Sequence, residues 1–176
     1  INNPNIILHL AAASHVDRSI SDPMSFVLDN VVGTVNLLNY ARDQKKLDKF
    51  IYFSTDEVFG PAPLKIKYKE DDRYNSGNPY AASKAGAEEM CVAFKNTYKM
   101  PIIVTHTMNV FGERQHPEKY LPKIINYILN KRTLTIHSNS NKTKAGSRFY
   151  IHAQDVADAV RFILSKGIIG EKYNIV

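Results

Sequence analysis

The sequence contains a single cysteine, Cys91, among its 176 residues. One cysteine excludes an internal disulfide, which favours a reducing compartment such as the cytoplasm. Cys91 falls in an apolar helical stretch, where a free thiol is usually part of the core. The sequence also lacks any apolar run of the roughly 18 residues that a membrane-spanning helix requires, so no membrane partner is expected.

Charge of one sign is not concentrated anywhere in the chain. Lys and Arg number 23 against 17 Asp and Glu, a net charge of +6. A nucleic-acid-binding chain would gather its basic residues in a stripe, so no nucleic acid partner is expected. Two explanations of the small excess of positive charge are equally good. The basic residues are simply solvated surface, or they create a field that attracts an anionic diphosphate substrate. His15 and Asp17 have no further ligand at a suitable spacing, so no metal site is predicted.

Short apolar segments alternate with helical patterns along the chain. This alternation predicts an α/β fold with a doubly wound, Rossmann-like parallel sheet that is covered on both faces. The first apolar segment, 6–10, needs neighbours on both edges, so we expect an N-terminally truncated domain. The strands are expected at 6–10, 49–54, 102–106, 134–136 and 173–176, and the helices at 23–42, 79–98, 118–130 and 154–166.

Tyr80 and Lys84 lie four residues apart at the start of a predicted helix, on one face of it. A neighbouring lysine lowers the pKa of a phenol, and a phenolate is a usable base for a sugar hydroxyl. An isolated Tyr-x-x-x-Lys is more often a surface pair, so the spacing alone does not decide between the two.

The segment Ser54-Thr55-Asp56-Glu57 ends an apolar strand, where ligands bind in parallel sheets. Two neighbouring carboxyl groups in different environments can take opposite protonation states, so that one acts as acid and the other as base. The alternative is a polar loop that caps the next turn. In isolation that alternative is favoured.

Three further polar or small segments follow predicted strands. The small residues after Leu10 let the backbone approach a ligand closely, or they form a packed turn. Asn109 can orient a ligand hydroxyl, or it belongs to a turn. Arg148 can pair with a phosphate through two N–H groups, or it is solvated.

Taken in order, these motifs resemble the extended short-chain dehydrogenases and, among them, the dTDP-glucose 4,6-dehydratases. The resemblance extends over nearly the whole chain. It is carried by Leu10-Ala-Ala-Ala-Ser-His-Val-Asp-Arg-Ser19, Asn30-Val-Val-Gly-Thr34, Ser54-Thr-Asp-Glu-Val-Phe-Gly60, Asn78-Pro-Tyr-Ala-Ala-Ser-Lys84, Asn109-Val-Phe-Gly112, Pro117-Glu-Lys119, Arg148 and Gly170-Glu-Lys-Tyr-Asn-Ile175.

The resemblance implies an NAD-dependent lyase that converts dTDP-glucose to a 4-keto-6-deoxy sugar. Tyr80 would take the sugar 4-OH proton with the help of Thr55, and Lys84 would hold the cofactor ribose and lower the tyrosine pKa. Glu57 would remove the C5 proton, and Asp56 would protonate the departing 6-OH. NAD would also contact Leu10, Ala11, Ala12, Ala13 and Ser14, and the nucleotide sugar would contact Ser14, Thr55, Asn109, Lys119, Tyr120 and Arg148.

The adjacent Asp56 and Glu57 distinguish this function from that of related enzymes. The 4-epimerases of the family lack the acid–base pair, and the decarboxylases usually keep only the glutamate. The alternatives are a UDP-glucose 4,6-dehydratase, a sugar-nucleotide 4-epimerase, or a catalytically silent NAD-binding sensor. The resemblance also implies a homodimer that pairs through helices 23–42 and 79–98.

The sequence departs from the family pattern at several places. Val110 stands where a second Asn is usual, and Ser138-Asn139-Ser140 replaces a Gly-x-Gly. The glycine-rich turn that binds the pyrophosphate is absent from the sequence. We therefore expect an incomplete NAD-binding domain at 1–112, elements of a substrate lobe at 113–148, and a return to the first domain at 149–176. Such a fragment is expected to be inactive by itself.

Overall fold

Four parallel strands form the centre of the molecule. The structure, a computed structural model, describes residues 3–63 and 66–176. The order across the sheet is β1-β2-β3-β6, and every neighbouring pair is parallel. The strands are β1 (Ile6–His9), β2 (Lys49–Thr55), β3 (Ile102–Thr107) and β6 (Lys172–Ile175).

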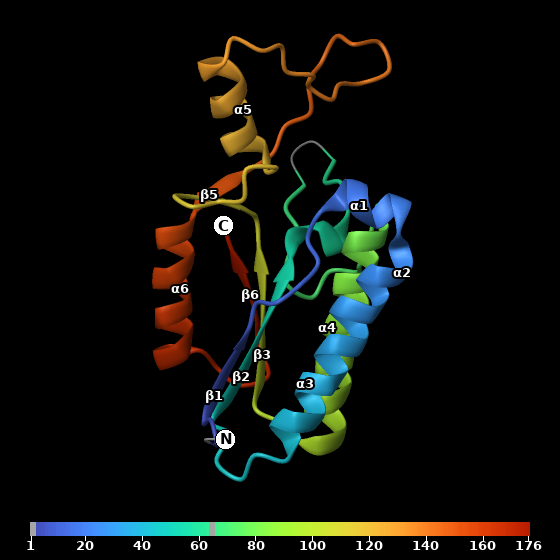
Figure 1. The fold of residues 1–176 in the computed structure, drawn as a ribbon. Coiled ribbons are helices and arrows are strands. Elements are labelled where there is room, and N and C mark those ends of the chain that lie inside the picture. Colours follow the sequence, from blue (N-terminus) through green and yellow to red (C-terminus); the bar gives the residue numbers. More distant parts are fainter. Residues whose placement is uncertain (1–2, 64–65) are drawn as a thin grey trace.

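Helices cover both faces of this sheet (Figure 1). On one face lie α4 (Pro79–Tyr98) and a continuous rod made of α2 (Pro23–Phe26), the π-helical segment η1 (Val27–Val32) and α3 (Gly33–Arg42). The other face is covered by α6 (Ala153–Lys166). The predicted doubly wound α/β fold is confirmed.

The core has two parts because successive side chains of a strand point to opposite faces. On β2, Phe50 and Tyr52 pack toward α3 and α4, whereas Ile51 packs toward α6. All three side chains are fully buried. A strand buried on both faces is continuously apolar, which explains why β2 could be recognised in the sequence.

Local signals fix where the helices begin and end. The Asp22 side chain accepts a hydrogen bond from Ser25 N at 3.2 Å and caps α2. Asn78 caps α4 in the same way, accepting from Ala81 N at 2.8 Å. Helix α6 ends before Gly167, where a Cβ would lie 2.5 Å from the Ile163 carbonyl oxygen.

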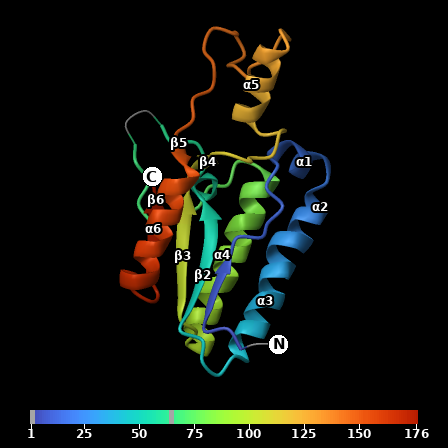
Figure 2. The ribbon, with the colours of Figure 1, turned by 60° about the vertical axis from the view of Figure 1, so that its left-hand side comes forward.

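Smaller elements gather at the carboxyl end of the sheet (Figure 2). They surround the ends of β2 and β3, which is where ligands bind in this type of fold. These elements are α1 (Val16–Ser21), the 3-10 helix η2 (Asp56–Phe59), the parallel pair β4 (Asn109–Phe111) and β5 (Tyr150–His152), and α5 (Tyr120–Leu129).

Several boundaries differ from those predicted. The strand expected at 134–136 does not form: the residues around it are mostly exposed and have no sheet edge to pair with. The nearby pairing is a single bridge between Ser138 and Ala145. The short elements α1, β4 and β5 occur in regions expected to be loops, and β4 and β5 have only three residues each. So short a segment gives too weak a periodicity to recognise.

Exposed apolar side chains mark the edge strand β1 and the helix α5. Ile6 and Leu8 are each 41% exposed on β1, and within 3–63 and 66–176 this strand pairs with β2 alone. In α5, Ile128 and Leu129 are still more exposed. No helix among the described residues combines the length and apolar character needed to cross a membrane.

Candidate active site

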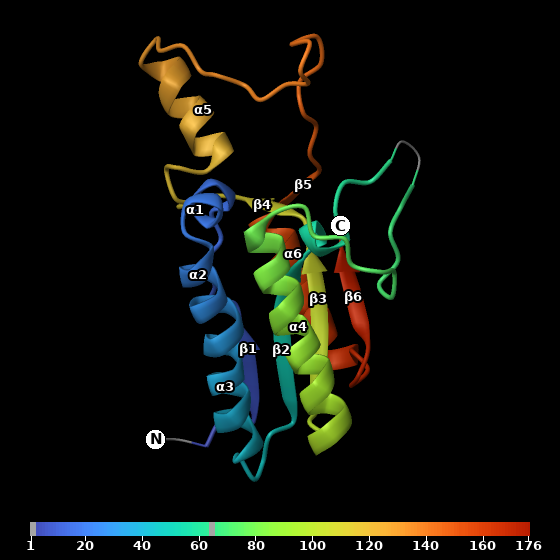
Figure 3. The same cartoon turned by 90° about the vertical axis from the view of Figure 1, so that its right-hand side faces the viewer.

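A cleft of about 930 Å³ opens at the carboxyl ends of the strands. Its lining residues come from the sheet, the start of α4 and the segment that leads into α5. Figure 3 shows how these elements are arranged. Most of the residues predicted to bind or react line this one cleft. They are Leu10, Ala12, Ser14, Thr55, Asp56, Glu57, Tyr80, Lys84, Asn109, Lys119 and Tyr120, whereas Ala11, Ala13 and Arg148 are outside its lining.

The two carboxyl groups lie on a tight turn at the end of β2. Thr55 is the last residue of the strand, and its Oγ1 accepts from Glu57 N at 3.3 Å, which starts the 3-10 helix. The Thr55 hydroxyl lies 3.3 Å from Asp56 Oδ1, to which it donates. Gly60 ends the turn at a φ of +77°, where a Cβ would also meet the Asn75 carbonyl oxygen at 2.2 Å. The turn therefore points both carboxylates toward the cleft.

Asp56 and Glu57 have different surroundings. Burial raises the pKa of Asp56, and the negative charge of Glu57 raises it further. The hydrogen bond from Thr55 and the charge of Arg148 act in the opposite direction but do not outweigh these effects. Glu57 instead accepts a hydrogen bond at Oε2 from Asn78 Nδ2, at 2.9 Å. The surroundings of Asp56 therefore favour its protonated form.

Tyr80 lies in the first turn of α4 and faces the same cleft. Its backbone N–H donates to Ser19 Oγ at 3.1 Å, so α1 supplies a partner for a free N–H at the helix start. Burial raises the pKa of the Tyr80 phenol to about 12; the nearby Thr55 hydroxyl opposes this shift, and the charges of Glu57 and Asp56 add to it. Lys84 is not among the groups that shift the Tyr80 pKa, so the expected lowering by the lysine is not what the structure shows.

Lys84 lies one turn further along α4 and is only 3% exposed. Its ammonium group donates to the Phe53 carbonyl oxygen at 2.6 Å and lies 4.3 Å from the centre of the Tyr52 ring. Burial lowers the pKa of Lys84 to about 8, although the negative charge of Glu88 opposes this shift. These contacts hold the ammonium at the floor of the cleft.

Two hydrogen bonds of the Asn30 side chain fix the loop after β1. The side chain accepts from Ala13 N at 2.8 Å and donates to Ala13 O at 3.0 Å, so it binds both sides of one residue. Asn30 is 1% exposed and belongs to the π-helical segment η1, a geometry often found at functional sites. The small residues at 11–14 thus form an ordered rim.

The opposite rim of the cleft comes from the segment before α5. Lys119 Nζ donates to Ser14 O at 2.9 Å and lies 3.3 Å from Ser14 Oγ. Arg18 Nη2 donates to both oxygens of Glu118 at 2.7 and 2.6 Å. Two rims that are about a hundred residues apart in sequence therefore meet across the cleft.

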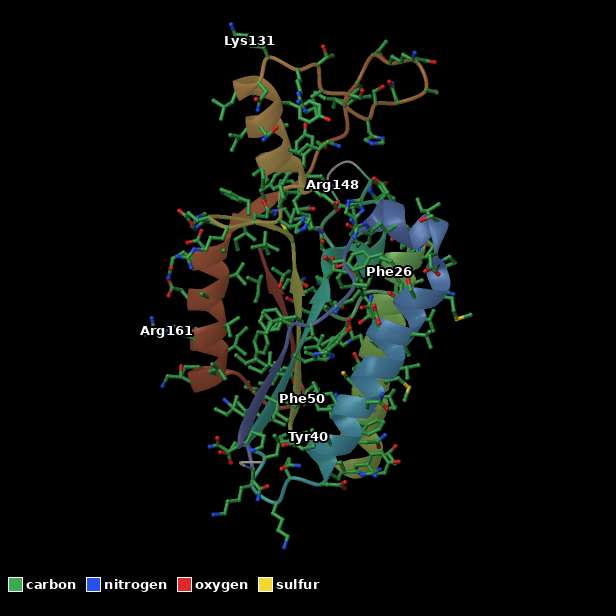
Figure 4. The ribbon with its side chains drawn as sticks, in the orientation of Figure 1. Phe26, Tyr40, Phe50, Lys131, Arg148 and Arg161 are labelled. Atoms are coloured by element: carbon green, nitrogen blue, oxygen red, sulfur yellow. The ribbon has the colours of Figure 1, made fainter. Side chains whose placement is uncertain are left out.

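The last two predicted residues lie toward the exposed side. Asn109 Nδ2 donates to Phe149 O at 3.2 Å, so its amide supports the β4–β5 pair. Arg148 is exposed where the chain returns from the segment after α5 (Figure 4), and its charge still reaches Asp56.

Some residues of the site were missed by the sequence reasoning. Asn78 contacts Glu57, and Arg18 and Glu118 join the two rims. The N-cap pattern before Pro79 was visible, but contacts between residues 21 and 100 positions apart leave no local signal. Thr107, the last residue of β3, also lines the cleft, and its buried hydroxyl has no hydrogen-bond partner among residues 3–63 and 66–176.

The residues of the cleft fit a bound NAD better than a metal ion. Among 3–63 and 66–176, no cluster of three His, Cys, Asp or Glu side chains is suited to a metal. The buried Thr107 hydroxyl, the buried Lys84 ammonium and the small residues Ala12 and Ser14 provide polar groups and space for a cofactor with ribose hydroxyls.

Comparison with known proteins gives matches over the whole chain. The model of the NAD dependent epimerase/dehydratase family matches residues 1–176. A dTDP-D-glucose 4,6-dehydratase of Dictyostelium discoideum is 40% identical and aligns with 97% of this chain and 41% of its own length. The chain spans about half the length of the curated relatives it matches.

Solved structures share the fold. DesIV, a dTDP-glucose 4,6-dehydratase from Streptomyces venezuelae with NAD and TYD bound, has a TM-score of 0.90 and 35% identity, over 97% of this chain and 51% of its own. A UDP-glucuronic acid 4-epimerase from Bacillus cereus, in complex with UDP-glucuronic acid and NAD, has a TM-score of 0.87 and 30% identity, over 97% and 53% of the chains.

Proposed function

Because the chain belongs to the NAD dependent epimerase/dehydratase family, we propose that it carries the catalytic centre of a nucleotide-sugar 4,6-dehydratase. The motif resemblance is thereby confirmed, as is NAD as the cofactor of the family. The observation that carries the proposal is that Asp56 and Glu57 line one cleft with Tyr80 and Lys84. Tyrosine and lysine suit hydride chemistry in general, and the adjacent carboxyl groups add the means to eliminate water.

Lys84, Thr107 and the rim at 10–14 would hold NAD in the proposed complex. When bound there, NAD would supply the hydride acceptor for oxidation at the sugar C4 and, once reduced, the hydride donor to C6. The Lys84 ammonium is buried and has donors beyond the one that Phe53 uses, which suits it to ribose hydroxyls. Tyr80 would share this contact.

Tyr80 would take the proton of the sugar 4-OH as C4 is oxidised. Charge that develops on the phenol would be offset by the Lys84 ammonium, and Thr55, whose side chain lines the same cleft, would align the phenol. The resulting 4-keto group makes the neighbouring C5–H bond more acidic. A base on the same side of the sugar can then remove that proton.

Glu57 would be this base, and Asp56 would be the acid that protonates the leaving 6-OH. Burial and the charge of Glu57 both favour the protonated form of Asp56. Glu57 Oε2 accepts a hydrogen bond from the Asn78 amide, a contact that suits an ionised carboxylate. One elimination step requires one ionised and one protonated group, and the difference in surroundings supports that division.

The other rim would receive the nucleotide sugar. Ser14, Thr55, Asn109, Lys119, Tyr120 and Arg148 are the proposed contacts, and dTDP-glucose is the proposed substrate. In this proposal residues 1–112 and 149–176 belong to the NAD-binding domain and 113–148 to the substrate lobe. Such a part is expected to be inactive by itself.

Assembly and location belong to the same proposal. Helices α2 to α4 would pair in a homodimer, and exposed apolar residues such as Met24 and Leu28 support this. The single cysteine, Cys91, is buried and free, which favours a cytoplasmic location.

The test is product analysis of the natural full-length protein with dTDP-glucose and, separately, with UDP-glucose. We expect a 4-keto-6-deoxy product, seen by its absorbance in alkali, with solvent deuterium at C5. Glu57→Gln should abolish the deuterium incorporation.

Three other outcomes would contradict the proposal. No product with either substrate would overturn it. A galactose-configured product without loss of water would indicate a 4-epimerase. Binding of NAD without turnover, unchanged in Glu57→Gln, would indicate a sensor.

A further inference from the structure

Asn78 joins the candidate base to the helix that carries Tyr80. Its Oδ1 accepts from Ala81 N at 2.8 Å, and its Nδ2 donates to Glu57 Oε2 at 2.9 Å. The Ala81 N–H can only donate, so the amide oxygen must face the helix and the NH2 group must face Glu57. The orientation of the Asn78 amide is therefore fixed by its partners.

Resting on the proposed function, we infer that Asn78 is a positioning residue that holds the Glu57 carboxylate in register with Tyr80. Asn78 and Tyr80 are two residues apart at the start of α4, and Tyr80 is tied to Ser19 through its own N–H. Glu57 lies on a different element, the 3-10 helix after β2. The hydrogen bond from the Asn78 amide therefore couples the position of the Glu57 carboxylate to the start of the helix that carries Tyr80.

The type of residue at position 78 matters because its side chain both caps α4 and binds the Glu57 carboxylate. Asn, Asp and Ser cap helices about equally well, since each offers an oxygen to the free N–H groups. Only Asn among them also offers an amide donor for a carboxylate. Asp at this position would repel Glu57, and the Ser hydroxyl is too short to span both contacts.

Other charged groups near Glu57 do not replace this contact. Asp56 is a neighbouring carboxyl group and repels it, and Lys119 senses its charge. The Lys119 ammonium, however, donates to Ser14 on the opposite rim. Asn78 is thus the group that binds Glu57 from the catalytic helix.

The experiment compares Asn78→Ser and Asn78→Asp in the natural full-length protein with its nucleotide sugar. Two rates are measured: reduction of NAD in a single turnover, which reports C4 oxidation, and incorporation of solvent deuterium at C5. A hydrogen bond to a charged group is worth enough to slow C5 exchange about tenfold to a hundredfold. The NAD reduction rate should stay within about threefold, since Tyr80 keeps its helix.

Matched controls separate positioning from folding. Both variants keep an N-cap oxygen, so their melting temperatures should stay close to that of the unsubstituted protein. Asn3→Ser makes the same change at an exposed position before β1, at the opposite end of the sheet from the cleft, and should alter neither rate.

The outcomes distinguish this role from the proposed function. Slower C5 exchange with NAD reduction retained, and a loss in Asn78→Asp at least as large as in Asn78→Ser, supports the inference. Unchanged C5 exchange in both variants overturns it, and so does an equal fall in both rates. An unsubstituted protein that converts no nucleotide sugar overturns both the proposed function and this role.

Discussion

The body of the molecule and its distal segment are held together in very different ways. In the body, made of the sheet with α2 to α4 and α6, side chains such as Leu38, Phe50 and Tyr52 are fully buried. In the distal segment, residues 120–148, no side chain is buried. Helix α5 is the most apolar part of that segment, and its Leu129 is 77% exposed.

The residues proposed to react lie in the well-packed body, whereas some of those proposed to bind the nucleotide sugar lie in the exposed distal segment. Thr55, Tyr80 and Lys84 belong to strands and helices of the body, whose packing holds their geometry before any ligand arrives. Tyr120 and Arg148, two of the predicted substrate contacts, belong to the distal segment. The reacting groups are therefore preorganised, whereas the nucleotide side depends on a few polar contacts across the cleft.

The strongest test of this contrast compares equal truncations in the two regions. Leu38→Ala removes a fully buried side chain from α3, so it should lower the free energy of unfolding by about 2–5 kcal/mol. Leu129→Ala removes an exposed one and should change it by less than about 0.5 kcal/mol. Denaturant unfolding of the natural full-length protein measures both.

A large loss of unfolding free energy in Leu129→Ala would contradict the contrast between the packed body and the exposed distal segment. A decrease above about 2 kcal/mol would show that α5 is covered in the natural protein, because an exposed leucine contributes little. A loss below about 1 kcal/mol for Leu38→Ala would contradict the burial seen in the body.

The same division explains how much of the fold the sequence predicted. β2 and β3 were recognised because strands buried on both faces are continuously apolar, and α4 because its first turns are rich in alanine, a strong helix former. The strand expected at 134–136 was wrong, since β-branched residues form a strand only where a partner edge exists. β4 and β5 have three residues each, too few to show a period.

The site followed the same rule. The motifs after β2 and at the start of α4 could be predicted to meet, because the carboxyl ends of parallel strands share one edge of the sheet. The pairs Asn78–Glu57 and Arg18–Glu118 could not, because their partners come from separate elements. The raised pKa of Tyr80 was also missed, since it depends on burial rather than on the neighbouring lysine.

His9 extends the comparison to acid conditions. It is buried at the end of β1, and its Nε2 lies 2.9 Å from Thr34 Oγ1. Burial, assisted by the positive charge of Lys84, lowers its pKa from 6.5 to about 4. Below pH 6.5 the unfolded chain binds a proton that the folded chain does not, so stability falls as the pH drops toward 4. At about 1.4 kcal/mol per unit, the loss is about 3 kcal/mol.

Unfolding curves between pH 7 and pH 4 check this expectation. His9→Gln should remove most of the pH dependence in that window, whatever its effect at pH 7. Lys84→Met should reduce the dependence only slightly, because burial is the larger cause. A His9→Gln protein with the same acid sensitivity as the unsubstituted protein would refute the assignment.

The smallest effect is expected at the Arg18–Glu118 pair, which joins α1 to the residues just before the distal segment. Both side chains are largely exposed, at 64% and 45%, so Glu118→Gln should cost less than about 1 kcal/mol of stability. A neutral glutamine binds Arg18 less tightly than the glutamate does. The neighbouring residue, Lys119, is then held less firmly in its hydrogen bond to Ser14. The KM for the nucleotide sugar should therefore rise several-fold with turnover nearly unchanged, and added salt should narrow the difference. Asp43→Asn alters a comparable exposed pair, Arg42–Asp43, at the far end of α3 and should leave KM unchanged. A fall in turnover in Glu118→Gln, with KM unchanged, would mean that this rim takes part in the chemistry, and the division between body and distal segment would not hold.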